Sequence, residues 1–587
     1  MIRLNKKSKI VCTVGPSTDK PGILERMMQA GMNVARFNFS HGKHEDHAQR
    51  IAMVRSAAAS LNRPIGLMLD TKGPEMRLGK FAEGKVNLEK GQQFILTARD
   101  IPGTAEIVSV NHKLLPREVA PGNIILLSDG LIGLVVERID GDDIITRVQN
   151  GGPISDNKRV AAPGVGVSLP PISPQDVADI LFGIEQDMDY IAASFIQRAA
   201  DVLAIRRILE ESGATMEIIA KIENAEGVKN IDEILNVVDG IMVARGDLGV
   251  EIPTEDVPLV QKMLIAKANK AGKPVITATQ MLESMLANPR PTRAEASDIA
   301  NAIMDGSDAI MLSGETASGS YPVEAVETMA RIAVRTEAAL NYNEILLTKG
   351  MVCEHSTTDA ISHATVQIAQ NLGAAAVITS TESGYTARMV SKYRPQASIV
   401  AVTPHAKTVR RMLLLWGVHP VLGSSSKNTD EMLTNSVSGA IATGEVKEGD
   451  LVVITAGVPI GTSGTTNLIR VHVVANVLMR GTGIGQKAVT GKVCVVHSLA
   501  EIKQNFRPGD ILVIASVDEE TAPYAAQAAA IVAEEGGLTS NAAIVGVSYG
   551  LPVLVGVTGV VEKLADGTVV TVDAARGLLY QGEINAR

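Results

Sequence analysis

Cysteine and aromatic residues are scarce in this chain of 587 residues. Its three cysteines, Cys12, Cys353 and Cys494, lie far apart and form no CxxC pair. A disulfide framework of the kind found in small secreted domains is therefore excluded, and a reducing compartment is expected. Aromatic residues make up 3% of the chain and the formal net charge is -9. Few rings can stack on bases and the charge repels a phosphate backbone, so nucleic acid is not expected as a partner.

Long apolar runs are also missing. No uncharged apolar stretch approaches the roughly 18 residues that a membrane-spanning helix needs, and the N-terminus has no sustained apolar segment before a small-residue cleavage site. We therefore expect no membrane partner and a cytoplasmic location. Apolar residues at 45% and charged residues at 20% are a normal globular balance. The length predicts roughly three or four domains.

Short runs rich in valine and isoleucine alternate with amphipathic helical patterns in the first part of the chain. Near-continuous hydrophobic strands that alternate with helices predict a parallel sheet covered on both sides, and eight such units predict a (β/α)8 barrel. The fold class is therefore α/β. The eight predicted strands are residues 10–14, 34–38, 65–70, 190–194, 217–222, 240–244, 275–279 and 308–312.

One connection in this pattern is far longer than a loop needs, since roughly 120 residues separate the third predicted strand from the fourth. Residues 71–169 carry short alternating strand patterns with glycine and proline between them, which predicts a small inserted β domain. The barrel then comprises residues 1–70 and 170–340. A separate α/β domain is predicted over residues 341–475, and an appended module rich in glycine and alanine over residues 476–587.

Active sites of such barrels lie at the carboxyl ends of the strands. Glu223 and Asp247 leave neighbouring strands at the same height, which places two carboxylates where Mg²⁺ prefers oxygen ligands. Lys221 stands two residues before Glu223, so both side chains face the same side of the strand. The alternative is an ion-pair network of the two acids with Lys221 and Arg245.

A second set of strand ends offers neutral oxygens and one carboxylate, which suits a monovalent cation better than a transition metal. Serine and asparagine at such positions are also common as caps and turn formers, so this alternative stays open. The set consists of Asn38, Ser40, Asp70 and Thr71.

The sequence segments around these strand ends together resemble the pyruvate kinase family over about residues 1–475. The most specific string is EIIAKIENAEGV at residues 217–228, which is similar to the family signature around its active-site lysine and metal-binding glutamate. The other matching strings are NVARFNFSHG at 33–42, LDTKGPEMR at 69–77, ARGDLGV at 244–250, ATQMLES at 278–284 and MLSGETA at 311–317.

The resemblance implies a glycolytic phosphotransferase that moves a phosphoryl group from phosphoenolpyruvate to ADP, giving pyruvate and ATP. It implies that Arg36, Lys221 and Mg²⁺ or Mn²⁺ on Glu223 and Asp247 hold the phosphate of phosphoenolpyruvate. It further implies that Gly246 and Thr279 complete this substrate site and that Thr279 serves in a relay that protonates the enolate at carbon.

The resemblance also implies a K⁺ site and a nucleotide site. Asn38, Ser40, Asp70 and Thr71 would hold K⁺, and a glutamate at position 75 accompanies K⁺ dependence in the family, whereas a lysine there can replace the ion. Asn38, His41, Arg77 and Lys158 would contact ADP. The segment after Asn157 is longer than the usual return to the barrel, which leaves the role of Lys158 open.

A loop after a predicted strand of the third domain is dense in hydroxyl groups around a glycine and resembles the effector loop of the family. The alternative is an ordinary capped helix start. Its residues are Thr379, Ser380, Thr381, Ser383, Gly384 and Thr386. A second loop at 457–466 lacks the Trp and Arg of fructose-bisphosphate-responsive relatives, so we expect a sugar monophosphate or a nucleoside monophosphate as effector. A homotetramer is implied by resemblance alone.

The last module contains GGLTSNAAIV at 536–545, which is similar to the mobile phosphohistidine domain of phosphoenolpyruvate-using enzymes. Asn541 stands where that family has its phosphorylated histidine, and an amide cannot act as this nucleophile. We therefore expect a non-catalytic module. Asn541 also argues against the alternative of a phosphoenolpyruvate synthase or phosphocarrier. A further alternative is a non-catalytic metabolite sensor. Such a protein would lack a catalytic group, yet Arg36, Lys221, Glu223, Asp247 and Thr279 are all present.

Overall fold

The computed structural model describes residues 6–350, 356–459, 464–475 and 477–584. Contacts between residues divide the chain into two compact units. The first consists of Met1–Val352, Ala387–Arg394 and His405–Pro420, and the second of Cys353–Thr386, Pro395–Pro404 and Val421–Arg587. Two short segments of the predicted third domain therefore pack with the barrel. The predicted domain boundaries remain a proposal.

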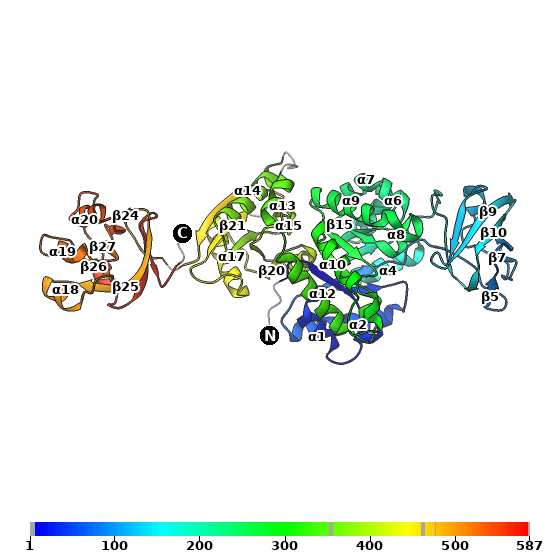
Figure 1. The fold of residues 1–587 in the computed structure, drawn as a ribbon, viewed down its shortest axis with the longest axis horizontal. Helices are drawn as coiled ribbons and strands as arrows, with labels where there is room; N and C mark the ends of the chain where they lie inside the picture. Colours follow the sequence, from blue (N-terminus) through cyan, green and yellow to red (C-terminus); the bar gives the residue numbers. More distant parts are fainter. Residues whose placement is uncertain (1–5, 351–355, 460–463, 476, 585–587) are drawn as a thin grey trace. The chain divides into compact units, whose positions relative to one another are not determined.

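The first unit contains a closed barrel of parallel strands in the order β1-β17-β16-β15-β14-β13-β3-β2 (Figure 1). The predicted α/β fold class with a (β/α)8 barrel is confirmed. The strands are β1 Lys9–Thr13, β2 Val34–Asn38, β3 Gly66–Asp70, β13 Tyr190–Ala193, β14 Glu217–Ile222, β15 Gly240–Ala244, β16 Val275–Ala278 and β17 Ala309–Leu312. The longer helices of this unit include α1 Ile23–Ala30, α2 His44–Ser60, α4 Pro174–Glu185, α5 Ala199–Glu211, α7 Ile231–Val237, α9 Val257–Lys270, α10 Arg293–Asp305, α12 Pro322–Glu337 and α13 Tyr342–Gly350.

The barrel interior is filled by alternate residues of its strands. Val34, Met68 and Ile219 belong to one buried apolar cluster inside the barrel. Because side chains on one face of a strand recur every second residue, the next inward positions on the same strands are Arg36, Asp70 and Lys221. The apolar core therefore changes to a charged layer toward the carboxyl ends of the strands, where the predicted chemistry lies.

The insertion after β3 forms a small β domain in the same unit. Its larger sheet has the order β4-β12-β8-β9-β10-β6-β7, and β5 pairs with β11 in a separate ribbon. Its buried apolar side chains form a core of their own. The strands are β4 Met76–Arg77, β5 Lys85–Leu88, β6 Gln93–Thr97, β7 Ile107–Ser109, β8 Ile124–Leu127, β9 Ile132–Asp140, β10 Asp143–Asn150, β11 Gly152–Ser155 and β12 Arg159–Ala161, with the short helix α3 Leu115–Glu118.

The remaining strands form a five-stranded sheet of order β20-β19-β18-β21-β22 and an eight-stranded sheet of order β23-β30-β29-β25-β26-β27-β28-β24. The first is formed by β18 Ala376–Ser380, β19 Ser398–Thr403, β20 Val418–Leu422, β21 Leu451–Ala456 and β22 Leu468–Val473, with helices α14 Thr357–Asn371, α15 Tyr385–Lys392 and α17 Thr429–Thr443. The second is formed by β23 Val477–Arg480, β24 Thr482–Ile484, β25 Ala488–Val496, β26 Ile511–Ile514, β27 Ala530–Ala533, β28 Val553–Val555, β29 Val569–Asp573 and β30 Leu578–Gln581, with helices that include α18 Leu499–Asn505 and α20 Asn541–Tyr549.

Within the described ranges, no helix combines the length and the apolar character needed to cross a membrane. Cys12 and Cys494 are buried free thiols. Cys353 lies outside the described residues.

Candidate active site

Lys221 is the central cation at the carboxyl end of the barrel. Its Nζ lies 3.0 Å from Asp70 Oδ1, 3.0 Å from Glu223 Oε1 and 2.7 Å from Ser194 Oγ. Burial favours the neutral amine, but the carboxylates of Asp70 and Glu223 outweigh this effect and raise the pKa of Lys221. Lys221 is therefore a cation held by two acids inside the barrel.

Arg36 lies beside this group on β2. Its Nε donates to Asp70 Oδ2 at 2.5 Å and its Nη1 donates to Thr13 Oγ1 at 2.8 Å. The Asp70 carboxylate is 1% exposed. Burial alone would raise the pKa of Asp70, yet Arg36 and Lys221 together hold it below its usual range. One ionised carboxylate thus orients two cations.

Glu223 follows β14 directly and is 1% exposed. The backbone N–H of Phe195 donates to its Oε2 at 2.7 Å. Its Oε1 makes no hydrogen bond, although Lys221 Nζ lies 3.0 Å away. Burial raises the pKa of Glu223 to about 7, with Lys221 opposing the shift and Asp247 adding to it.

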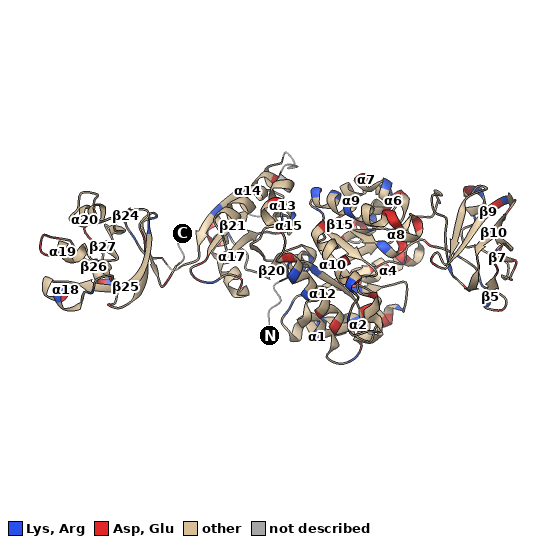
Figure 2. Ribbon diagram, in the orientation of Figure 1, with Lys and Arg blue, Asp and Glu red and all other residues tan. Residues whose placement is uncertain are grey.

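Asp247 lies in the first turn of α8 Arg245–Glu251, which begins directly after β15. Figure 2 shows acidic positions on α8 and on α6 Ala225–Lys229, the helices that follow β15 and β14. Arg159 of the inserted domain donates from Nη1 to Asp247 Oδ1. Arg245 instead pairs with Asp298 at 2.7 Å. An ion-pair network therefore exists, but the cation on Asp247 is Arg159 and not Arg245.

Thr279 lies one residue beyond β16. The predicted strand 275–279 is one residue too long, because Thr279 and Gln280 have φ of 68° and 54° and cannot continue it. Thr279 Oγ1 accepts from the N–H of Gly246 at 2.8 Å and donates to the carbonyl of Ala278 at 2.6 Å. The left-handed turn thus fixes the hydroxyl group against Gly246.

The set assigned to K⁺ lies around the end of β3. Asn38 pairs in register with Asp70, and Asn38 Oδ1 accepts from the N–H of Ser40 at 3.1 Å. Thr71 Oγ1 accepts from the N–H of Ser194 at 3.1 Å. Asn38 therefore also stabilises a turn, as the alternative interpretation expected.

The residues assigned to the nucleotide lie on the rim. His41 and Lys158 are exposed. Arg77 Nε donates to Glu75 Oε2 at 2.9 Å, and Arg77 Nη1 donates to the carbonyl of Asn157 at 2.8 Å. Arg77 is therefore anchored to the segment that carries Lys158.

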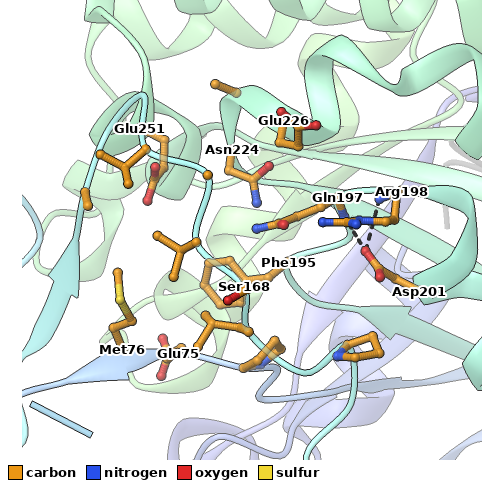
Figure 3. Close-up of a pocket in the computed structure, with 18 of the residues that line it drawn as sticks. Glu75, Met76, Ser168, Phe195, Gln197, Arg198, Asp201, Asn224, Glu226 and Glu251 are labelled. Carbon is orange, nitrogen blue, oxygen red and sulfur yellow. Dashed lines mark hydrogen bonds between the residues drawn. The ribbon is translucent and has the colours of Figure 1, made fainter. Parts of the chain in front are cut away.

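A cavity of about 740 Å³ opens beside these strand ends (Figure 3). Phe195, Asn224 and Glu251 line it from the barrel side, while Glu75, Met76 and Ser168 line it from the segments that connect the barrel to the inserted domain. Arg159 borders the cavity and also contacts Asp247. Lys221 and Arg36 do not line it, so the cavity adjoins the charged layer without enclosing it.

The residues present fit a divalent cation. Glu223 and Asp247 are hard oxygen donors of the kind that Mg²⁺ and Mn²⁺ prefer. Glu223 Oε1 is a buried carboxylate oxygen that makes no hydrogen bond and lies 3.0 Å from the ammonium group of Lys221, so it keeps lone pairs that a second cation could use.

Two domain models of one known family match this chain in sequence. The family described as the pyruvate kinase barrel domain matches residues 5–326, and the pyruvate kinase alpha/beta domain matches residues 359–472. A pyruvate kinase of Geobacillus stearothermophilus is 53% identical over 99% of each chain. This chain belongs to the pyruvate kinase family. A pyruvate kinase of Bacillus licheniformis is 52% identical over 98% of this chain and 99% of its own.

A solved structure of a pyruvate kinase from Cryptosporidium parvum superimposes with a TM-score of 0.77 at 39% identity, covering 80% of this chain and 96% of that one. The mobile domain of phosphoenolpyruvate-utilising enzymes matches residues 506–577. The predicted resemblances, including that of the last module, are thus confirmed. The chain is a pyruvate kinase family phosphotransferase, whose reaction converts phosphoenolpyruvate and ADP to pyruvate and ATP.

Three contributors to this pyruvate kinase site were missed from the sequence. Ser194 and Phe195 follow β13, where the same strand-end rule that identified Asp247 would have found them. Arg159 is the first residue of β12 and directly follows Lys158. Alternation along a strand sends neighbouring side chains to opposite faces, and the structure exposes Lys158 while burying Arg159 at 9% exposure.

The effector-loop residues lie in the second unit, from the end of β18 into the first turn of α15. Thr379 and Ser380 end β18. Thr381 Oγ1 accepts from the N–H of Gly384 at 3.0 Å, and Thr386 Oγ1 lies 2.8 Å from Thr466 Oγ1. Ser383 completes the loop. Residues 460–463 of the second predicted loop lie outside the described residues.

Asn541 begins α20 in the last module. Its Nδ2 donates to the carbonyl of Val517 at 2.8 Å, and Ser540 caps the helix by accepting from the N–H of Ala543. The amide therefore has a structural role at the position where the mobile-domain family has its histidine.

Proposed function

We propose that Arg36 and Lys221 bind the phosphate of phosphoenolpyruvate, together with Mg²⁺ or Mn²⁺ on Glu223 and Asp247. The observation that carries this assignment is the position of Lys221 Nζ, 3.0 Å from both Asp70 Oδ1 and Glu223 Oε1. A fixed cation and a carboxylate oxygen that makes no hydrogen bond then lie side by side at one strand end. This arrangement suits phosphoryl transfer, which needs positioning and charge neutralisation more than a covalent nucleophile.

Each side chain has a separate task in this proposal. Arg36 and Lys221 neutralise charge on the transferring group, and Asp70 keeps both cations oriented. When bound, the divalent cation would add Lewis-acid neutralisation of the phosphoryl oxygens. Thr279, with its hydroxyl fixed beside Gly246, passes a proton through water toward the enolate carbon, because a threonine hydroxyl is too weak an acid to be the proton's origin.

ADP would bind from the rim through Asn38, His41, Arg77 and Lys158. Arg77 supports this assignment because its contact with the carbonyl of Asn157 joins it to the Lys158 segment. K⁺ would lie among Asn38, Ser40, Asp70 and Thr71, whose side chains offer one carboxylate and three neutral oxygen donors.

Removing K⁺ is expected to lower the turnover of pyruvate formation by roughly tenfold or more in the wild-type enzyme. Glu75→Lys should remove most of this dependence, because the lysine supplies the missing positive charge. Pyruvate formation from phosphoenolpyruvate and ADP is measured with Mg²⁺, with and without K⁺. Glu83→Lys, an exposed change in the inserted domain, is the matched control. Equal K⁺ dependence of Glu75→Lys and wild type would contradict the proposal.

A phosphorylated small molecule is proposed to bind at the effector loop, where Thr379 Oγ1 is a buried hydroxyl without a hydrogen bond. We expect activation by a sugar monophosphate or a nucleoside monophosphate at subsaturating phosphoenolpyruvate, and loss of that activation in Thr381→Val. The test measures initial rates of pyruvate formation by the wild-type enzyme and by Thr381→Val with each effector. Activation by fructose bisphosphate alone would show that the ligand is assigned wrongly.

Deleting residues 481–587 is expected to leave turnover within about twofold of wild type, since Asn541 cannot carry a phosphoryl group. Stability should fall, because Tyr580 and Ile584 of the module form a buried cluster with Val473. A loss of about 1 kcal/mol corresponds to about 2–4 °C in Tm. Thermal unfolding and steady-state rates are measured together. A large loss of turnover in a folded deletion variant would show a catalytic role for the module.

A homotetramer and a cytoplasmic location are further proposals. Both follow from the family resemblance, and the small number of cysteines also supports a reducing compartment.

A further inference from the structure

Arg159 connects the inserted domain to the proposed metal site. It lies on β12, a strand of the inserted domain that pairs with β4 and with β8. Arg159 is opposite Arg77 of β4. Its guanidinium nevertheless reaches the barrel, where Nη1 donates to Asp247 Oδ1 and Nη2 lies 3.8 Å from Glu251 Oε1. Asp247 and Glu251 are four residues apart on α8 and so lie on one face of that helix.

The barrel holds this guanidinium in place from a second side. The Phe195 ring lies beneath it, with 5.0 Å between the guanidinium carbon and the ring centroid, a cation–π distance. Phe195 also donates its backbone N–H to Glu223 Oε2. Its left-handed φ of 58° orients the N–H toward Glu223 and the ring toward Arg159. Arg159 is therefore a buried cation, 9% exposed, enclosed by an aromatic ring and the acids of α8.

A guanidinium and a divalent cation compete for the same carboxylate. A charge-assisted hydrogen bond from arginine occupies lone pairs of Asp247 Oδ1 that a metal ion would use. Two cations at the same carboxylate also repel one another. Binding of the metal to Asp247 therefore favours loss of the Arg159 contact, and that contact ties β12 of the inserted domain to α8.

We infer that Arg159 is an internal counter-ion, which holds Asp247 in the metal-free enzyme and releases it when Mg²⁺ or Mn²⁺ binds. This inference rests on the proposed metal site at Glu223 and Asp247. Metal binding and the contact of the inserted domain with α8 are then coupled, and each weakens the other by the same factor. Arg159 acts through Asp247 and is a positioning residue.

The test measures Mn²⁺ binding to the full-length enzyme without substrates, by electron paramagnetic resonance. Arg159→Met is expected to bind Mn²⁺ about tenfold more tightly than wild type, which corresponds to about 1.4 kcal/mol. Arg147→Met is the matched control, because Arg147 pairs with Glu137 on the exposed surface of the same domain. Its Mn²⁺ affinity should equal that of wild type. Arg159→Lys, which keeps the charge without the planar fork, serves if the methionine variant does not fold and should bind Mn²⁺ with intermediate affinity.

Hydrogen exchange separates loss of a contact from a general effect of charge. In the wild-type enzyme, saturating Mn²⁺ should speed the exchange of backbone amide hydrogens in residues 157–162. In Arg159→Met, the same amide hydrogens should exchange at the same rate with and without Mn²⁺. Unchanged or weaker Mn²⁺ binding in Arg159→Met, or no Mn²⁺-dependent exchange in wild type, overturns the inference. Asp247→Asn should bind Mn²⁺ weakly. If it binds as well as wild type, the proposed metal site fails first and the inference fails with it.

Discussion

Replacing Lys221 by methionine is expected to lower kcat by about 1,000-fold or more, the range found when a charge-neutralising cation is removed from a phosphoryl-transfer site. The substitution removes the one positive charge that Asp70 and Glu223 share at 3.0 Å. Two buried carboxylates then face each other with less compensation. We therefore also expect the free energy of unfolding to fall by about 3–5 kcal/mol, measured in urea.

Activity and stability must be separated in this experiment. Lys229→Met is the matched control, because Lys229 lies at the same end of the barrel on α6 but is 75% exposed and pairs only loosely with Glu226. It should keep the wild-type rate and stability. Rates are compared at a temperature where circular dichroism shows both variants folded. A folded Lys221→Met enzyme with near wild-type kcat would disprove the proposed role.

Replacing Glu223 by glutamine is expected to weaken Mn²⁺ binding by about 100-fold, because an amide oxygen carries no charge and one of two acidic ligands is lost. The metal-free protein should not lose stability. Burial raises the pKa of Glu223 to about 7, so its ionisation opposes folding, and the stability contributed by the neutral acid is lost as the pH rises through that value. A neutral glutamine avoids this loss.

Glu226→Gln is the matched control for this change. Glu226 lines the neighbouring cavity three residues further on, but its side chain is 42% exposed, so Mn²⁺ affinity should stay within about twofold of wild type. Metal titrations followed by electron paramagnetic resonance give the affinities, and thermal unfolding in a chelator gives the stability. Equal weakening in both variants would point to a general effect of negative charge rather than to a metal ligand at Glu223.

The barrel was predictable because its signals are local and repeated. Each strand is a short and mostly apolar run, and a parallel sheet buried on both faces needs such runs. The exact residue at which each strand ends does not follow from these local signals. The strand predicted at 275–279 stops at Ala278 because Thr279 adopts a left-handed φ of 68°, and no propensity of threonine indicates that conformation.

The sequence by itself determined the barrel, the insertion after its third strand, and the placing of Lys221 and Glu223 on one face of the same strand, because strand alternation is a property of the backbone. Only the tertiary structure decided which charges meet. Arg159 and Asp247 are 88 residues apart, and their contact depends on how the inserted domain packs on the barrel. Periodicity carries no information on such a contact. The sequence therefore offered only Lys221 and Arg245 as partners of the two acids, whereas packing brought Arg159 to Asp247.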